Sequence, residues 1–196
     1  MTTAPSNTGS RRTAADLAYV AVFAALIVAL AFISIPVGAA GIPIVLQNAA
    51  IVLAGLILGP RRAFLAVLLF LALGLIGFPV LAGGRTTLAA LAGPTVGYLA
   101  GYALSAWAAG ALAYRAPARR RRAQLGWFTL ATVIGLLIQY ACGILGLMWR
   151  AGLDLPAAIL AQAPFLVPDI LKFTAMVIIA AAVHAAFPDL LSRKRR

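Results

Sequence analysis

The sequence predicts an all-α integral membrane protein with six transmembrane helices and both termini in the cytoplasm. Three observations lead to this prediction. Of the 196 residues, 64% are hydrophobic and only 10% are charged, whereas a soluble domain carries about 25% charged residues. Segments rich in glycine and proline divide the apolar sequence into pieces near the roughly 20 residues that a membrane-spanning helix needs. The basic residues gather in short clusters between those pieces.

The positions of the helices follow from charge-free stretches and from helix breakers. The first stretch runs from Leu17 to Pro60, which is too long for one span, and the breaker-rich residues 36–43 divide it. Spans are expected at about 16–35, 43–59, 62–79, 88–114 and 125–149, and from between 164 and 168 to about 187. A short interfacial helix is expected at 156–163. The polar residues 1–15 are expected to be disordered, residues 16–187 to form the six-helix domain, and residues 188–196 to form a basic cytoplasmic tail.

The distribution of basic clusters sets the expected orientation. Clusters occur at 11–12, 61–62, 115–122 and 193–196, and all four lie on one side of the membrane if the chain crosses six times. The other three connections hold only Arg85, Arg150 and Asp154. Because cytoplasmic loops carry the excess of Lys and Arg, the clusters predict that both termini lie inside. Five or seven spans would break this alternation.

Composition also excludes several classes of function. The net charge of +12 does not indicate nucleic-acid binding here, because the positive-inside rule explains the clusters. Cys142 is the only cysteine and His184 the only histidine, so a zinc site is excluded. Paired catalytic acids, a serine–histidine set and a P-loop are absent from the sequence. An enzyme is therefore not expected, and neither is a cofactor.

Asp169 and Lys172 are the two charged residues that most need an explanation. They lie in the last apolar stretch, where each charge costs up to about 2.5–3.5 kcal/mol on insertion scales. Residues three apart share one face of a helix. One interpretation is a structural ion pair that neutralises itself. The other is an occluded pocket, in which Asp169 accepts hydrogen bonds from ligand N–H groups and Lys172 meets a carboxylate or a carbonyl oxygen.

Arg85 is the second candidate. It stands in a loop on the outer side, directly after two glycines that would let the backbone approach a ligand. The alternatives are a plain solvated charge and a bidentate contact with an anion. Further polar residues on the spans, each of which taken alone favours helix packing over ligand contact, are Gln47, Asn48, Thr95, Tyr98 and Tyr140.

A stripe of small residues follows the first expected helix. Ala21, Ala25 and Ala29 are spaced four apart, which permits close helix approach within the fold or to a partner. In so alanine-rich a chain, internal packing is the favoured use.

Five segments follow one another in the chain as a distinctive set. They are Gly41-Ile42-Pro43-Ile44-Val45-Leu46-Gln47, Leu53-Ala54-Gly55-Leu56-Ile57-Leu58-Gly59-Pro60-Arg61, Gly74-Leu75-Ile76-Gly77-Phe78-Pro79-Val80-Leu81-Ala82-Gly83-Gly84, Gly93-Pro94-Thr95-Val96-Gly97-Tyr98-Leu99 and Pro164-Phe165-Leu166-Val167-Pro168-Asp169-Ile170-Leu171-Lys172. In this order the segments resemble the BioY family, the biotin-binding S components of energy-coupling factor (ECF) transporters. The resemblance runs from about residue 17 to 187, and one pattern departs from the family, with Val96 in place of a glycine.

The resemblance implies the ECF S-component fold, with biotin bound near the outer side. The family's Pro-x-Asp-x-x-Lys segment maps onto Asp169 and Lys172. Asp169 is then expected to bind the ureido N–H groups of biotin, and either Lys172 or Arg85 its carboxylate. The remaining candidate substrate-binding residues are Tyr140, Gln47 and Thr95.

The resemblance also implies partners and a location. These are a transmembrane coupling protein, two ATP-hydrolysing subunits and the lipid bilayer of a bacterial inner membrane, with Ala21 and Ala25 facing the coupling protein. Two rival functions remain open at this stage. One is an S component for another vitamin, and the other is a membrane scaffold in which Asp169 and Lys172 are structural.

Overall fold

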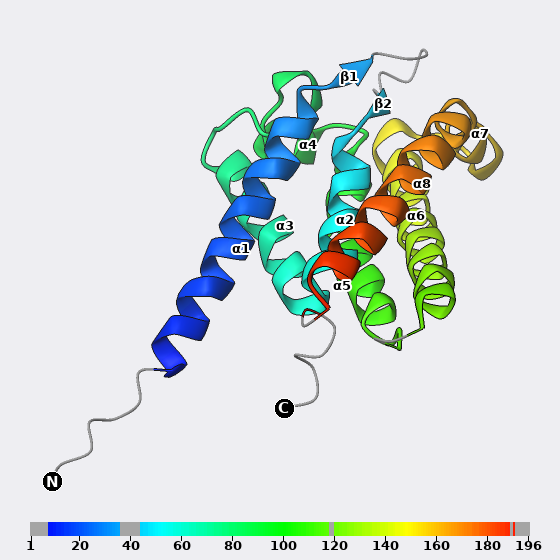
Figure 1. Cartoon of the computed structure of the whole chain (residues 1–196). Helices are drawn as coiled ribbons and strands as arrows, with labels where there is room; N and C mark the ends of the chain where they lie inside the picture. Colours follow the sequence, from blue (N-terminus) through cyan, green and yellow to red (C-terminus); the bar gives the residue numbers. More distant parts are fainter. Residues whose placement is uncertain (1–7, 36–43, 118–119, 189, 191–196) are drawn as a thin grey trace, which may run out of the picture.

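The computed structural model describes residues 8–35, 44–117, 120–188 and 190, and their backbone is almost entirely helical. Residues 1–7, most of the predicted basic tail and the breaker-rich residues 36–43 lie outside the described residues. The elements, shown in Figure 1, are α1 (Thr8–Ala31), β1 (Ser34–Ile35), β2 (Ile44–Val45), α2 (Gln47–Leu58), α3 (Pro60–Leu75), η1 (Ala82–Gly84), α4 (Thr87–Ala92), α5 (Val96–Ala113), α6 (Arg121–Ala151), α7 (Leu155–Leu160) and α8 (Ala163–Ala186).

The first two helices differ from their predicted bounds. α1 begins at Thr8, so residues 8–15, predicted as part of a disordered terminus, are helical, and α1 ends at Ala31 rather than near residue 35. Ser34 and Ile35 are extended and pair in antiparallel register with Val45 and Ile44. This short β-ladder therefore shortens both helices that the apolar run predicted, and α2 begins only at Gln47.

The prediction of one continuous helix at 88–114 is wrong. The structure divides it into α4 and α5 at Gly93-Pro94-Thr95. Pro94 has no N–H to donate, and a residue that precedes proline is driven towards extended backbone. Gly93 is extended accordingly, with φ −98° and ψ 175°. The break leaves Thr95 at the N-terminal end of α5.

The other helices agree more closely with the prediction. α3 begins with Pro60 at its first position, where a missing N–H costs nothing, and it ends four residues before the predicted end at 79. α6 extends further at both ends than the predicted 125–149. The short helix α7 occupies the position expected for an interfacial helix, and α8 starts at Ala163, within one residue of the expected range.

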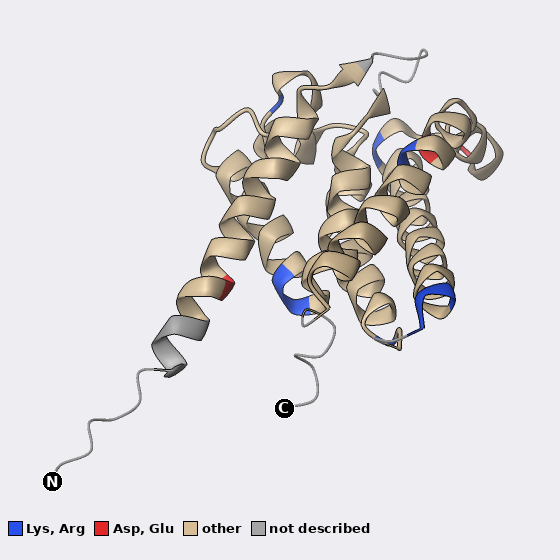
Figure 2. Ribbon diagram, viewed as in Figure 1, with Lys and Arg blue, Asp and Glu red and all other residues tan. Residues whose placement is uncertain are grey.

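The long helices run alternately up and down. The starts of α3 and α6, each of which carries a pair of arginines, lie at the same end of the bundle as the end of α8 (Figures 1 and 2). The starts of α2, α5 and α8 lie at the opposite end, beside β1 and β2 (Figure 1). Residues that are far apart in sequence, at 45–48, 95–102 and 165–172, therefore meet at that opposite end.

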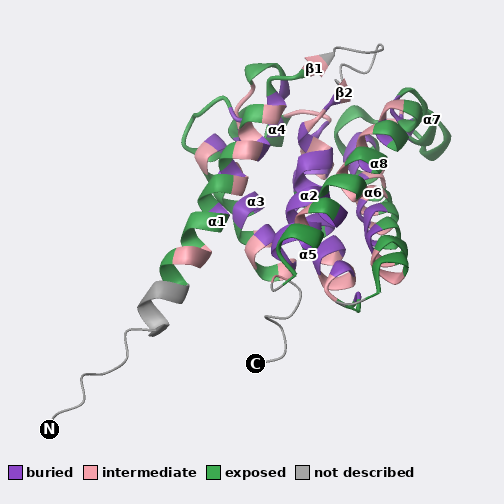
Figure 3. Cartoon of the chain, viewed as in Figure 1, coloured by how far each residue is buried: buried purple, intermediate pink, exposed green. Residues whose placement is uncertain are grey.

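Helix α2 occupies the centre of the bundle. All but one of its twelve residues are buried, and its neighbours are α1, α3, α5, α6 and α8 (Figure 3). At its C-terminal end the Leu56 and Ile57 carbonyl groups lack helical partners, and for Leu56 the reason is that Pro60 has no N–H. His184 of α8 bonds the Leu56 carbonyl oxygen at 2.8 Å, and the Tyr114 hydroxyl donates to the Ile57 carbonyl oxygen at 2.7 Å. Side chains from α5 and α8 thus satisfy the buried end of α2.

The membrane character of the chain is evident from its helices. Among the described residues, four helical stretches are long and apolar enough to cross a bilayer: Thr13–Ala31, Val96–Ala113, Arg121–Ala151 and Leu155–Ala186. The apolar helix α2 is shorter, and its twelve residues rise only about 18 Å. Large apolar side chains on the other helices face outward, as lipid-facing residues do. Together these features bear out the all-α membrane class.

Candidate functional site

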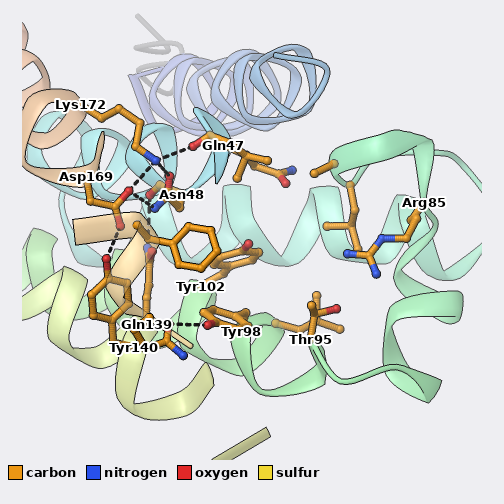
Figure 4. A pocket seen from close by; sticks show the side chains of 16 residues that line it. Gln47, Asn48, Arg85, Thr95, Tyr98, Tyr102, Gln139, Tyr140, Asp169 and Lys172 are labelled. Atoms are coloured by element: carbon orange, nitrogen blue, oxygen red, sulfur yellow. Dashed lines mark hydrogen bonds and ion pairs between the residues drawn. The ribbon is translucent and has the colours of Figure 1, made fainter. Parts of the chain in front are cut away.

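A pocket lies at the end of the bundle where α2, α5 and α8 begin. Its wall is built by β2, the start of α2, the segment around η1, the start of α5, the middle of α6 and the first half of α8 (Figure 4). The residues that line it are Val45, Gln47, Asn48, Leu81, Ala82, Arg85, Thr95, Tyr98, Leu99, Tyr102, Gln139, Tyr140, Gln162, Phe165, Asp169 and Lys172. All six substrate-binding candidates from the sequence are in this set.

An ion pair forms one end of the pocket. Lys172 Nζ lies 2.5 Å from Asp169 Oδ1, and the two side chains are only 9% and 1% exposed. Lys172 also donates to the Val45 carbonyl oxygen at 2.7 Å and to Asn48 Oδ1 at 3.0 Å. An ammonium group has three protons, so these three partners use all of its donors. The predicted pairing on one helix face is confirmed.

Asn48 and Tyr140 complete the same cluster. Asn48 Nδ2 donates to Asp169 Oδ1 at 3.2 Å, and the Tyr140 hydroxyl donates to Asp169 Oδ2 at 2.7 Å. A carboxylate oxygen can accept two hydrogen bonds, so Oδ2 keeps one acceptor position, and the Asn48 amide keeps one N–H. The cluster of Asn48, Tyr140, Asp169 and Lys172 can therefore still accept from one ligand group and donate to another.

Gln139 holds Asn48, a member of this cluster, in place through its backbone. Its side chain is buried, and Nε2 donates to the Asn48 carbonyl oxygen at 3.2 Å and to Ser105 Oγ at 3.0 Å. Gln47 is held in a similar way, because its Nε2 donates to the Val80 carbonyl oxygen at 2.8 Å. These bonds tie α6 to α2 and α5, and α2 to the segment before η1.

Arg85 forms the other end of the pocket. In Figure 4 it lies on the opposite side from Asp169 and Lys172, with Tyr98 and Tyr102 between. Its side chain makes no hydrogen bond or ion pair within the described part of the chain. Gly83 and Gly84, both at φ 71°, shape the turn before it, and this conformation favours glycine. Arg85 is therefore a guanidinium held beside the pocket with its donors unused.

Thr95 lies on the same side as Arg85 in Figure 4. Its hydroxyl is buried and has no hydrogen-bond partner among the described residues. A buried polar group without a partner is costly unless a ligand or water satisfies it. The break at Pro94 leaves Thr95 at the start of α5, among the residues that line the pocket.

The middle of the pocket is aromatic and apolar. The Tyr98 hydroxyl is directed away to Gln162 Oε1, at 2.6 Å, which leaves its ring as the exposed wall. Tyr102, Leu99, Phe165 and Leu81 contribute further apolar surface. The pocket thus has two polar ends and an apolar centre. Its charged residues are Arg85, Lys172 and Asp169, and two cations against one anion leave an excess of one positive charge.

Part of this pocket wall was not predicted from the sequence. Asn48 and Tyr98 were expected to pack between helices, and Tyr102, Gln139 and Gln162 were not among the candidate residues. A polar residue on an apolar helix signals its importance, but the partners here are up to 121 positions apart in sequence. Ala21 and Ala25 are exposed on α1 and lie outside the pocket. Among the described residues no group of three His, Cys, Asp or Glu could hold a metal ion.

The chain matches the BioY family over residues 2–189. It belongs to the BioY family. The biotin transporter BioY of Rhodobacter capsulatus is 42% identical over 186 residues, covering 90% of this chain and 96% of that protein. The biotin transporter BioY of Rhizobium etli is 36% identical and covers 91% of this chain and 97% of its own length.

A solved structure gives the same result for this BioY family chain. The S-component for biotin from an ECF-type ABC transporter superposes with a TM-score of 0.80 at 28% identity, covering 89% of this chain and 93% of that one. The family resemblance and the S-component fold expected from the sequence are confirmed.

Proposed function

We propose that this chain is the S component of a biotin uptake transporter, which captures biotin in the pocket between Arg85 and the Asp169–Lys172 pair. The observation that carries the proposal is the order of chemical groups along the pocket. The cluster around Asp169, which can still donate and accept, is followed by an apolar centre and then by the guanidinium of Arg85. Biotin has the same order, with a ureido group, an apolar bicycle and chain, and a carboxylate. Its single negative charge matches the single excess positive charge of the pocket.

The hydrogen bonds indicate which cation meets the carboxylate. Lys172 already gives its three protons to Asp169, Asn48 and Val45. Among the described residues Arg85 makes no side-chain hydrogen bond or ion pair, and Thr95, on the same side of the pocket in Figure 4, has a buried hydroxyl without a partner. We therefore assign the carboxylate to Arg85 and Thr95. The ureido group belongs with Asp169, Asn48 and Tyr140, and Lys172 acts mainly by holding Asp169 and Asn48 in place.

The proposed topology is six spans with both termini inside. α1, α2, α3, α5, α6 and α8 are the six crossing helices, and α2 is short because other helices surround it. Arg61 and Arg62 start α3, and Arg121 and Arg122 start α6, at one end of the bundle (Figure 2). The pocket lies at the other end, which under the positive-inside rule is the outer side.

The proposed partners are the ECF transmembrane coupling protein and two ATP-hydrolysing subunits. Ala21 and Ala25 are exposed on α1 and permit close approach of another helix. Replacing Ala25 by Phe should abolish co-purification with the coupling protein and leave biotin binding intact. Ala141→Phe, at an exposed position of α6, is the matched control. Loss of co-purification in both variants, or in neither, would contradict this interface.

The function is tested by equilibrium binding of biotin to detergent-purified protein. Wild type should bind biotin with a dissociation constant in the nanomolar range, and micromolar or weaker binding would contradict the biotin assignment. Arg85→Gln should weaken binding about 100-fold through the lost ionic contact, and Asp169→Asn and Lys172→Ala should weaken it at least as much. Unchanged affinity in all three variants would remove this pocket from the mechanism, whereas absence of biotin binding in wild type would favour another vitamin or the scaffold interpretation.

A further inference from the structure

The charged groups of the pocket address only the two ends of a ligand. The cluster of Asn48, Tyr140, Asp169 and Lys172 forms one end, and Arg85 with Thr95 forms the other. Between them lie Tyr98, whose hydroxyl donates to Gln162, and Tyr102. The ligand's centre therefore meets mainly rings and aliphatic side chains, and no charged group.

This centre contains no charged group, thiol or thioether that would single out a sulfur atom, and the Tyr102 hydroxyl could donate only a weak hydrogen bond to it. Neither cysteine nor methionine occurs among the described residues that line the pocket. A thioether is a weak hydrogen-bond acceptor, and the aromatic and aliphatic groups of Leu99, Tyr102 and Phe165 contact sulfur and carbon alike. In biotin the sulfur lies in the bicycle, between the ureido group and the chain. The wall thus senses the shape of that region and not its chemistry.

We propose that the pocket binds sulfur-free cyclic ureas that carry a carboxyalkyl chain, so that dethiobiotin is a second ligand of this chain. Dethiobiotin keeps both ureido N–H groups, the ureido oxygen and the carboxylate, and lacks only the sulfur bridge. The inference rests on the proposed function, because it uses the same placement of the two ends.

A ligand should lose different amounts of affinity when it lacks a group that meets an end of the pocket and when it lacks one that meets the centre. A missing apolar part in a hydrophobic pocket costs about 10- to 200-fold in recognition, whereas loss of a group that the site is built to bond costs up to about 10⁴-fold or more. Dethiobiotin should therefore bind within about 200-fold of biotin. The primary amide of biotin keeps the sulfur and loses the negative charge opposite Arg85, so it should bind more weakly than dethiobiotin.

The test measures equilibrium binding of biotin, dethiobiotin and biotin amide to the full-length purified protein, in wild type and in Arg85→Gln. In wild type the expected order is biotin, then dethiobiotin, then the amide. In Arg85→Gln, biotin and the amide should converge to within about fivefold, because the charge contact that separates them is lost. The ratio of biotin to dethiobiotin should stay within about threefold of its wild-type value, because that difference arises in the centre.

The outcomes separate the two proposals. If biotin itself does not bind wild type, the proposed function fails and this inference fails with it. If biotin binds while dethiobiotin is bound more weakly than the amide or not at all, the function stands and the inference is overturned. A biotin to dethiobiotin ratio that collapses in Arg85→Gln would also overturn it, because the sulfur would then be sensed through the Arg85 end.

Discussion

At the scale of single residues, the candidate site depends on which hydrogen-bond groups are already used. Asp169 and Lys172 are among the most buried charges of the chain, and each has several partners. A buried ion pair is weak evidence for stability, but removing one member strands the other charge. Their adjacency was predictable, because residues three apart on a helix share a face. That Asn48 is bonded to both was not predictable, since it comes from another helix.

The ion pair gives a residue-scale prediction. Lys172→Met should lower the free energy of unfolding by about 3–5 kcal/mol, because it leaves Asp169 charged, buried and without its cation. The double variant Lys172→Met with Asp169→Asn should recover most of that loss, since it removes the stranded charge. Thermal unfolding of the purified proteins measures both effects. A double variant no more stable than the single one would contradict this account, and neither variant is expected to retain nanomolar biotin binding.

At the scale of the elements, the short helix α2 illustrates how buried ends are satisfied. Pro60 allows α3 to start immediately after Gly59, but it leaves the Leu56 carbonyl without a donor from its own helix. Because a carbonyl oxygen only accepts, the Nε2 atom of His184 must carry the proton in the observed contact. The same side chain packs against the Phe128 ring, with centroids 5.1 Å apart. His184 is therefore a structural residue at the C-terminal end of α2.

Substitution of His184 tests this role. His184→Leu should lower the free energy of unfolding by about 1–3 kcal/mol, the cost of a buried acceptor left unpaired. His184→Gln keeps an N–H donor and should recover part of the loss. Both variants should retain biotin affinity, since the pocket lies at the other end of α2. Equal stability of the Leu and Gln variants, by thermal unfolding in detergent, would show that the contact with Leu56 contributes nothing.

The packing of α5 against α6 depends on glycine at close approach. A Cβ atom added to Gly97 would overlap the carbonyl oxygen of Cys142. Gly97 also lies between Thr95 and Tyr98, which line the pocket. In the sequence, Gly97 is part of a segment that resembles the BioY family. Only the contact between α5 and α6 explains why Gly97 cannot carry a side chain.

Gly97→Ala should therefore destabilise the fold by about 1–3 kcal/mol through overpacking, and it should weaken biotin binding by displacing Thr95 and Tyr98. Gly126→Ala is the matched control in α6, because a Cβ there meets nothing within 4 Å. That variant should be neutral or more stable by about 0.5–1 kcal/mol, the helical preference for alanine over glycine. Melting curves and biotin titrations check both. A fully stable Gly97→Ala with normal affinity would refute the close approach.

At the scale of the whole molecule, the up-and-down order of the helices separates two ends. The pocket and the charged cluster lie at one end, and the arginines that start α3 and α6 lie at the other (Figure 2). The hydrophobic core fills the space between, with α2 in its centre. This separation is what a protein that collects a ligand from outside and contacts partners inside would need, and it makes the orientation testable.

Cysteine labelling tests the orientation. In a Cys142→Ala background, Ala151→Cys lies at the end of α6 near the pocket, and Pro117→Cys lies between α5 and α6; both positions are exposed. A membrane-impermeant maleimide should label Ala151→Cys in intact cells and Pro117→Cys only after permeabilisation. The reverse pattern would invert the proposed topology, and labelling of both from outside would rule out the six-span order.

The sequence by itself determined the membrane class, the family, most helix positions and the pairing of Asp169 with Lys172. These features depend on local composition and on the fixed geometry of a single helix. The sequence and the spacing of its residues are therefore enough to predict them. Only the tertiary structure decided where Pro94 breaks a predicted helix and which residues join Asp169 across helices. It also decided that the Lys172 ammonium group uses all three of its protons, whereas the Arg85 guanidinium has no hydrogen-bond partner among the described residues. Those outcomes depend on contacts between helices that are distant in sequence, because helix packing alone sets the distances between their side chains.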